Sequence, residues 1–155
     1  MTRRIFDAPA MLLVLALALC TSVVSAKAQA KQKLTVAVPF DFEVGETTFA
    51  AGEIIVRRIS QNRNILLVTT ADGDQNQLRL TYPIRADEIQ AGGKLVFHRY
   101  GNRYFLTEVW VPGKQTGRQL TMSNGELAIQ REMLDYVTST DAPEVETVTV
   151  LASLR

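Results

Sequence analysis

Residues 95–111 read LVFHRYGNRYFLTEVWV, and this stretch decides the fold. Two runs rich in β-branched and aromatic side chains flank the dipeptide Gly101-Asn102. A two-residue loop that begins with glycine is typical of a type II′ β-hairpin, and such a turn fixes the register of its strands. The predicted cross-strand pairs are Phe97 with Leu106, His98 with Phe105, and Arg99 with Tyr104. We therefore expect an antiparallel hairpin here.

Upstream of the hairpin, residues 34–44 alternate between apolar and polar side chains. A period of two with one apolar face predicts a half-buried strand. Pro39 falls on the polar side and cannot donate a backbone hydrogen bond, so it places the strand at a sheet edge or bends it there. The side chains expected to point inward are Leu34, Val36, Val38, Phe40, Phe42 and Val44.

Three further strands are predicted between this segment and the hairpin. Residues 53–59 are rich in β-branched side chains, and 78–85 alternate between apolar and polar. The apolar run 65–68 is typical of a central strand covered on both faces, although it also fits a buried helix segment. Asp72-Gly73 favours a tight turn. We expect the apolar side chains to collapse inward, and residues 87–93 to form a linker or a short helical turn.

Helical spacing replaces the strand pattern after residue 117. Ser123, with Glu126 three residues later, is a capping-box signal. The apolar residues that follow at helical spacing are Ile129, Met133, Tyr136 and Val137. We expect an amphipathic helix over 124–137 that packs on the sheet, although Leu127 and Ile129 could also begin a strand. The tail, 139–155, ends in a stretch that forms a short last strand or frays.

These patterns together predict a mainly β protein with a C-terminal amphipathic helix. The expected architecture is an antiparallel β-sandwich or open barrel of about six or seven strands, because short strands with regular turn signals favour that class. The β-rich domain, including the helix, is expected to span residues 31–138.

Residues 1–30 have the pattern of a secretory signal peptide. A basic start at Arg3-Arg4 precedes the apolar run 11–19 and the small-residue stretch 25–30. Ala28 and Ala30 both fit the cleavage rule, so we expect cleavage after one of them and a location in the periplasm or outside the cell. The alternatives are an uncleaved membrane anchor and lipidation at Cys20.

Charge and cysteine content limit the function of the remaining chain. Cleavage removes three of the 17 basic and one of the 16 acidic residues, which leaves a net charge of about −1. Such a balance gives no electrostatic reason to bind nucleic acid or an anionic membrane. Cys20 is the only cysteine, so the exported domain has no disulfide and no thiol nucleophile. We expect no cofactor, no metal and no membrane span after cleavage.

Motifs at both ends of the predicted sheet resemble those of a known group of proteins. Residues 38–45 read VPFDFEVG, Ala51-Gly52 follows, and 97–110 read FHRYGNRYFLTEVW. This series resembles a family of small secreted bacterial proteins with a VPFDF-x-VG opening, a PAG-like turn and a YG-x-x-YFL-x-x-W hairpin. Ala50 and Ile54 depart from the family's usual proline and aromatic residue. The resemblance implies an envelope or extracellular setting and no particular activity.

Two sequence features have the form of metal or acid–base sites. Residues 72–76 read DGDQN, which opens like a calcium loop, but Gln77 and Pro83 occupy the positions of the required glycine and glutamate. We interpret this segment as a solvated turn. His98 is the single histidine, and no carboxylate lies at a fixed offset from it, so we expect a packed or surface role.

An acidic cluster is formed by Asp41, Glu43, Glu46 and Glu53. Paired carboxylates perform glycoside chemistry only where a pocket raises one pKa, and these residues lie on a predicted polar face. We therefore expect ordinary solvation. Asp41 could instead cap a neighbouring backbone group or pair with an arginine.

The hairpin supplies the candidate contact residues for a ligand or partner: Arg99, Tyr100, Tyr104 and Trp110. Strict alternation would put Arg99, Tyr104 and Trp110 on one face. An exposed face could stack on a sugar or an aromatic ligand, and a buried one would be core packing.

The sequence thus favours a non-enzymatic binding or structural module of the bacterial envelope, with no catalytic residue. Its expected partner is an envelope protein or a glycan. The alternative is a small β-barrel carrier whose apolar ligand contacts the inward side chains of 34–44. A hydrolase that uses Asp41 and Glu43 is the third possibility.

Overall fold

The computed structural model describes residues 33–59, 64–136 and 145–152, and the predicted signal segment lies outside them. The described residues form ten strands and one helix. The elements are β1 (Lys33–Val38), β2 (Phe42–Val44), β3 (Thr47–Phe49), β4 (Gly52–Arg58), β5 (Ile65–Thr70), β6 (Asn76–Gln90), β7 (Lys94–Tyr100), β8 (Arg103–Trp110), β9 (Lys114–Leu120), α2 (Asn124–Tyr136) and β10 (Glu146–Leu151). The predicted mainly β fold with a C-terminal helix is confirmed, with ten strands in place of six or seven.

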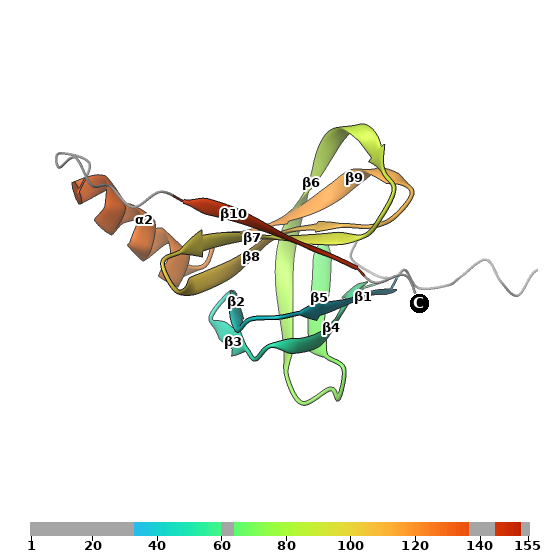
Figure 1. The fold of residues 1–155 in the computed structure, drawn as a ribbon, viewed down its shortest axis with the longest axis horizontal. Coiled ribbons are helices and arrows are strands. Elements are labelled where there is room, and N and C mark those ends of the chain that lie inside the picture. The colour runs from blue at the N-terminus through green and yellow to red at the C-terminus, as the bar shows by residue number, and fades with distance from the viewer. Residues whose placement is uncertain (1–32, 60–63, 137–144, 153–155) are drawn as a thin grey trace, which may run out of the picture. The chain divides into compact units, whose positions relative to one another are not determined.

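The strands form one continuous open sheet. Hydrogen-bonded neighbours follow the order β1-β4-β5-β6-β9-β8-β2-β3, with β7 joined to β8 and β10 joined to β7. The long strand β6 pairs with β5 along its first half and with β9 along its second, so it runs from one layer into the other (Figure 1). The described parts of β1 and β10 pair only with β4 and β7, so the barrel stays open. The sheet is mixed, because β2 lies parallel to β8 at Glu43 and Phe105.

The core fills the space between the two layers. Phe42 is fully buried in it, with its ring centroid 5.3 Å from that of Phe97 and 5.5 Å from that of Phe49. The buried side chains of the core come from both layers: Leu34, Val36, Val38, Phe42, Val44, Phe49, Ile54, Val56, Leu66, Val68, Leu95, Phe97, Leu106, Val109 and Leu120. The inward side chains predicted for 34–44 are in this set, apart from the half-buried Phe40.

The predicted strand over 34–44 bends at its proline. β1 ends at Val38 and β2 begins at Phe42, with Pro39 in the bend between them. This break follows from the missing amide hydrogen of proline, which cannot continue a ladder. The bend moves the chain from β1, paired with β4, to β2, which pairs with β3 and β8.

The β7–β8 hairpin has the predicted register. Phe97 pairs with Leu106, His98 with Phe105 and Arg99 with Tyr104. Gly101 has a φ of 61°, the backbone conformation that the first central position of a type II′ turn requires. The register shifts beyond Phe97, where Val96 pairs with Glu108, so Thr107 is the extra residue of a β-bulge.

The orientation of β6 is opposite to the expected one. Its apolar side chains Leu78, Leu80 and Tyr82 are 53%, 47% and 57% exposed, while Thr81 between them is 1% exposed. Thr81 donates its hydroxyl to the carbonyl oxygen of Asn64 at 2.9 Å, and the Arg79 guanidinium donates to the carbonyl oxygen of Thr121 at 2.6 Å. These hydrogen bonds hold the polar side inward. The expectation that apolar side chains collapse inward is therefore wrong for this strand.

Three segments for which the sequence predicts no strand are strands, and β3 over Thr47–Phe49 is the first of them. β6 continues to Gln90 through the predicted linker, and β9 pairs with both β6 and β8. The sequence of β9, KQTGRQL, has little apolar content, so its place between two partners comes from backbone hydrogen bonds. In the central strand β5, Leu66 and Val68 are buried but Ile65 and Leu67 are half-buried, so only one face is fully covered.

The helix α2 is confirmed, but its packing differs from the expectation. Figure 1 shows α2 extending away from the β7–β8 hairpin. Ile129 and Met133 are half-buried, and Leu134 is 71% exposed. The beginning of the helix is held instead by hydrogen bonds that the side chains of Ser123, Glu126 and Gln130 form with other groups. Further along the chain, β10 forms the last strand on β7.

Candidate functional site

The predicted contact residues of the hairpin lie on two different faces. Arg99 and Tyr104 lie on the core side, where Tyr104 packs against the core. The bulge at Thr107 shifts the alternation, so that Leu106 and Val109 both enter the core and Trp110 lies on the other face with Tyr100. The expected grouping of Trp110 with Tyr104 is therefore wrong, because strict alternation counts no extra residue.

The ring of Tyr104 contacts two side chains. Phe40 stacks on it with 4.0 Å between ring centroids and an interplanar angle of 18°. The guanidinium carbon of Arg99 lies 5.5 Å from the ring centroid, and the same guanidinium pairs with Glu146 of β10 at 2.9 Å. These contacts join β8 to β10 through Arg99, and Phe40 occupies one face of the Tyr104 ring.

Trp110 is 6% exposed and lies over a glycine. A Cβ atom at Gly117 would come within 2.6 Å of its ring, and the ammonium of Lys94 lies 5.4 Å from the ring centroid. The indole nitrogen donates to the carboxylate of Glu108 at 2.8 Å. Trp110 therefore packs β8 against β9.

The hairpin and α2 meet at a buried carboxylate. Glu126 is 3% exposed, and its Oε1 lies 3.0 Å from Nδ1 of His98 and 3.3 Å from the phenol oxygen of Tyr100. Gln130 donates to the same phenol oxygen at 3.0 Å. We call Glu126, His98, Tyr100 and Gln130 the Glu126 cluster. Burial raises the pKa of Tyr100, the Gln130 hydrogen bond opposes this, and the charge of Glu126 raises it further.

Two side chains cap the first turn of α2: Ser123, which directly precedes the helix, and Glu46, which is distant in sequence. The hydroxyl of Ser123 accepts a hydrogen bond from the amide of Glu126 at 3.1 Å, as the capping box predicts. The carboxylate of Glu46 accepts one from the amide of Asn124, also at 3.1 Å. Both oxygens satisfy amide groups that a helix start leaves unpaired. In place of closing the capping box, the Glu126 side chain turns to the hairpin.

Sequence reasoning missed the contact between His98 and Glu126. The capping-box spacing drew attention to Glu126, and His98 stood out as the single histidine. Their contact could not be predicted, because the two residues belong to different elements and no short sequence spacing connects them. The sequence held one weak signal. The chain has a single histidine, His98, and a glutamate, Glu126, occupies the first turn of the predicted helix.

The predicted acidic cluster is dispersed into separate structural contacts. Asp41 accepts a hydrogen bond from the amide of Ala51 at 2.8 Å, which is the backbone cap considered for it. Glu43 forms a bidentate ion pair with Arg103, with N–O distances of 2.8 and 2.9 Å. This bonding raises the pKa of Arg103, against the smaller opposing effect of burial. Asp41 and Glu43 therefore hold elements of the fold together.

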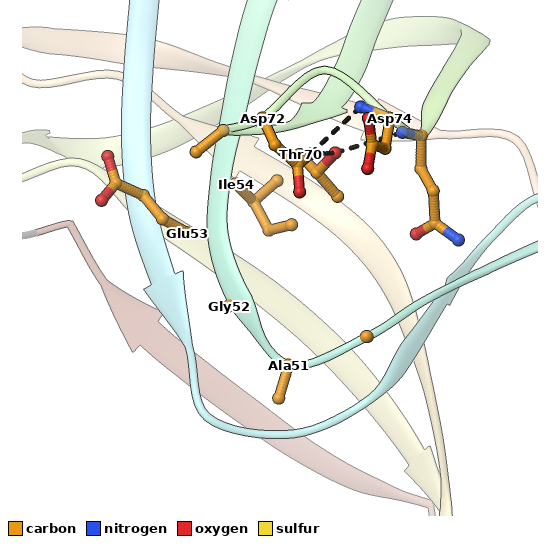
Figure 2. A pocket seen from close by; sticks show the side chains of 10 residues that line it. Ala51, Gly52, Glu53, Ile54, Thr70, Asp72 and Asp74 are labelled. Carbon is orange, nitrogen blue, oxygen red and sulfur yellow. Dashed lines mark hydrogen bonds between the residues drawn. The ribbon is translucent and has the colours of Figure 1, made fainter.

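A hollow of about 450 Å³ lies between the turn before β4 and the loop from β5 to β6. Asp72 and Asp74 are among the residues that line it, and Figure 2 shows Glu53 and Ile54 pointing to opposite sides of β4. The Thr70 hydroxyl bonds to Asp72, and the amide of Asp74 donates to the same carboxylate at 3.1 Å. These hydrogen bonds lower the pKa of Asp72. In the described part of the chain, no three His, Cys, Asp or Glu residues are grouped to hold a metal ion.

The exposed apolar side chains Leu78, Leu80 and Tyr82 are named here the β6 strip. They lie at alternate positions and so share one face of β6. Leu67 and Ile65 of β5, both half-buried, stand opposite Leu78 and Leu80. The result is a contiguous apolar surface over two strands.

Comparison with protein-family models, with curated proteins and with solved structures finds no match to this chain. Among the helices of the described residues, none has the length and apolar character to cross a membrane.

Proposed function

We propose that this chain is a non-enzymatic binding module of the bacterial envelope. The observation that carries this proposal is the β6 strip. Leu78, Leu80 and Tyr82 are about half exposed, although the opposite side of the same strand faces the core. Contiguous exposed apolar side chains on a small domain mark sites where another molecule binds. Tyr82 also adds a residue type that is enriched in protein interfaces.

The positions of the chemically active side chains support binding over catalysis. Asp41 caps a backbone amide, Glu43 pairs with Arg103, and Glu126 joins α2 to the hairpin. Each of these carboxylates connects two elements of the fold. A hydrolase would need one of them in a pocket where it could reach a substrate and exchange a proton.

The packing also bears on the kind of ligand. Tyr104 and Trp110 are the side chains best suited to stack on a sugar, but Phe40 already stacks on the ring of Tyr104, and Trp110 is buried over Gly117. This favours a protein partner over a glycan. The inward side chains proposed to line a carrier's cavity contact one another in the core instead. This packing favours a binding module over a carrier.

Export is proposed from the sequence of residues 1–30 and from the resemblance to secreted bacterial proteins. The basic start, the short apolar run and the small residues at 25–30 together form the pattern that signal peptidase cleaves. We propose cleavage after Ala28 or Ala30 and a location in the periplasm or outside the cell.

One purification tests both parts of this proposal. The full chain with a C-terminal affinity tag is produced in a bacterium and isolated from the envelope fraction under mild conditions. An intact mass that lacks residues 1–28 or 1–30 supports export, and the full-length mass contradicts cleavage.

A matched pair of variants tests the binding surface in the same preparation. We expect a partner protein to co-purify with the unaltered chain and to be lost from Leu78→Asp/Leu80→Asp. The control Thr147→Asp/Thr149→Asp places two charges on exposed positions of β10 and should retain the partner. If nothing co-purifies with the unaltered chain, or if both double variants retain the partner, the β6 strip is not a binding surface.

A further inference from the structure

The outer face of β1, β4, β5 and β6 carries a row of two cations followed by two leucines. The strand registers pair Lys33 with Arg57, Arg57 with Leu67, and Leu67 with Leu78. Directly paired residues of neighbouring strands lie on the same face of a sheet. Neighbouring strands are about 4.8 Å apart, so the row is about 14 Å long.

The two cations of this row are unfavourably placed for folding. Like charges directly opposite each other on antiparallel strands destabilise the pair. Lys33 and Arg57 are both exposed, and among the described residues no carboxylate forms an ion pair with either of them. One end of the row therefore carries two positive charges that no carboxylate of the described residues pairs with, and the other end is apolar.

The overall charge balance of the domain conceals this separation. A net charge near zero describes the whole surface, whereas binding depends on the charges within about one Debye length, about 8 Å at physiological ionic strength. Within that distance of Arg57, the paired neighbours on the outer face are Lys33 and Leu67.

We propose that this face binds a partner protein through a segment in which carboxylate side chains stand next to apolar ones. The carboxylates lie against Lys33 and Arg57, and the apolar side chains cover Leu67 and the β6 strip. This inference rests on the binding function proposed above and adds the chemistry of the partner. Charges of opposite sign across an interface select the partner and its register.

The layout of the row favours a protein segment over a lipid surface. At a lipid surface, apolar side chains enter the acyl boundary while cations stay at the headgroups, so the two kinds of group lie at different depths. Here both kinds project from one sheet face and are separated along it. A peptide segment that lies across the strands matches that arrangement.

Photo-cross-linking in living cells tests the inference. A photoreactive amino acid replaces Leu80 in the full chain, which is produced in its bacterial host. We expect a protein adduct whose cross-linked peptide, sequenced by mass spectrometry, has Asp or Glu within a few residues of apolar side chains. Arg57→Glu should lower the adduct yield about tenfold, whereas Arg57→Lys should keep most of it, because it keeps the charge.

Two controls separate binding from folding. The photoreactive residue at Thr149, exposed on β10, should not give the same adduct. A circular dichroism spectrum of purified Arg57→Glu should match that of the unaltered chain. If that variant misfolds, Lys33→Glu takes its place in the same comparison.

The remaining outcomes distinguish this inference from the function on which it rests. A protein adduct that Arg57→Glu leaves unchanged overturns the acidic partner but keeps the binding module. A lipid adduct, identified by its mass, or a cross-link to a second copy of the chain also overturns the inference. If the photoreactive residue at position 80 gives no adduct, either in the unaltered chain or in the Arg57 variants, both the inference and the proposed binding surface are overturned.

Discussion

Oε1 of Glu126 lies 3.0 Å from Nδ1 of His98, although 28 residues separate them in the sequence. Glu126 belongs to the first turn of α2 and His98 to β7, so this contact joins the helix to the hairpin. Among the described residues of α2, the hydrogen bonds to other elements come from Asn124, Glu126 and Gln130, all in its first two turns, and these hold the helix in position. The contact is therefore central to how the C-terminal part of the chain is held.

Removing the buried carboxylate should destabilise the protein. Glu126→Gln keeps the shape of the side chain but removes the charge that His98 and Tyr100 contact, and we expect a loss of about 1–3 kcal/mol. Urea denaturation followed by circular dichroism measures this. The matched control Glu132→Gln alters an exposed glutamate of the same helix and should change stability by less than about 0.5 kcal/mol. Equal effects of the two variants would contradict a role for the Glu126 cluster.

Tyr100 should make stability depend on pH in the alkaline range. Burial and the charge of Glu126 raise its pKa above the ordinary value of 10.0. A raised pKa in the folded state means that folding favours the protonated phenol, so this stabilisation is complete below about pH 10 and is lost as the pH rises further.

Comparison with Tyr100→Phe isolates this contribution from other groups that titrate at high pH. The difference in unfolding free energy between the unaltered chain and Tyr100→Phe should stay constant from pH 7 to about pH 9 and then shrink. Denaturation series at several pH values measure it. A difference that grows with pH would mean that the folded state favours the phenolate.

The contact of Trp110 with Gly117 predicts a sharp difference between two glycines. Gly117→Ala places a Cβ atom 2.6 Å from the indole ring, so the ring or the strand must move, and we expect a loss of about 1–3 kcal/mol. Gly92→Ala meets no atom within 4 Å and has no positive φ, so its effect should be neutral or slightly stabilising. Thermal unfolding of both variants measures the two changes in stability.

The reversed orientation of β6 predicts the effect of substitutions in neighbouring strands. Leu80→Lys should change the unfolding free energy by less than about 0.5 kcal/mol, because the side chain is 47% exposed. Leu66→Ala in β5 removes a side chain that is 4% exposed and should cost about 2–5 kcal/mol. If Leu80→Lys unfolds the chain, the apolar side of β6 is covered in solution.

Local sequence patterns were sufficient for several elements. The Gly101-Asn102 turn fixed the hairpin and its three cross-strand pairs, and Ser123 marked the start of the helix. Pro39 marked the bend between β1 and β2. In each case one or two residues restrict the backbone of their own segment, so the information lies within a few positions of the structure that it determines.

The candidate site was less predictable than the fold. Alternation separates Tyr100 from Arg99 and Tyr104, and the bulge at Thr107 moves Trp110 away from Tyr104 to the face of Tyr100. A bulge shifts the phase of the alternation, but β8 has buried apolar side chains on both faces, Phe105 and Trp110 on one and Leu106 and Val109 on the other, so its sequence shows no phase from which the shift could be read. The sequence correctly predicts a strand over Leu78, Leu80 and Tyr82, but it predicts that these side chains point inward, whereas they are exposed.

The sequence by itself determined which segments extend, turn or coil, because backbone restriction and side-chain periodicity act over a few neighbouring residues. Only the tertiary structure decided which side of β6 faces the core and that Glu126 contacts His98. Periodicity shows that a strand has two unlike sides, but the element that covers one of them is supplied by distant parts of the chain. For β6, the carbonyl groups of Asn64 and Thr121 bind its polar side chains and turn that side inward.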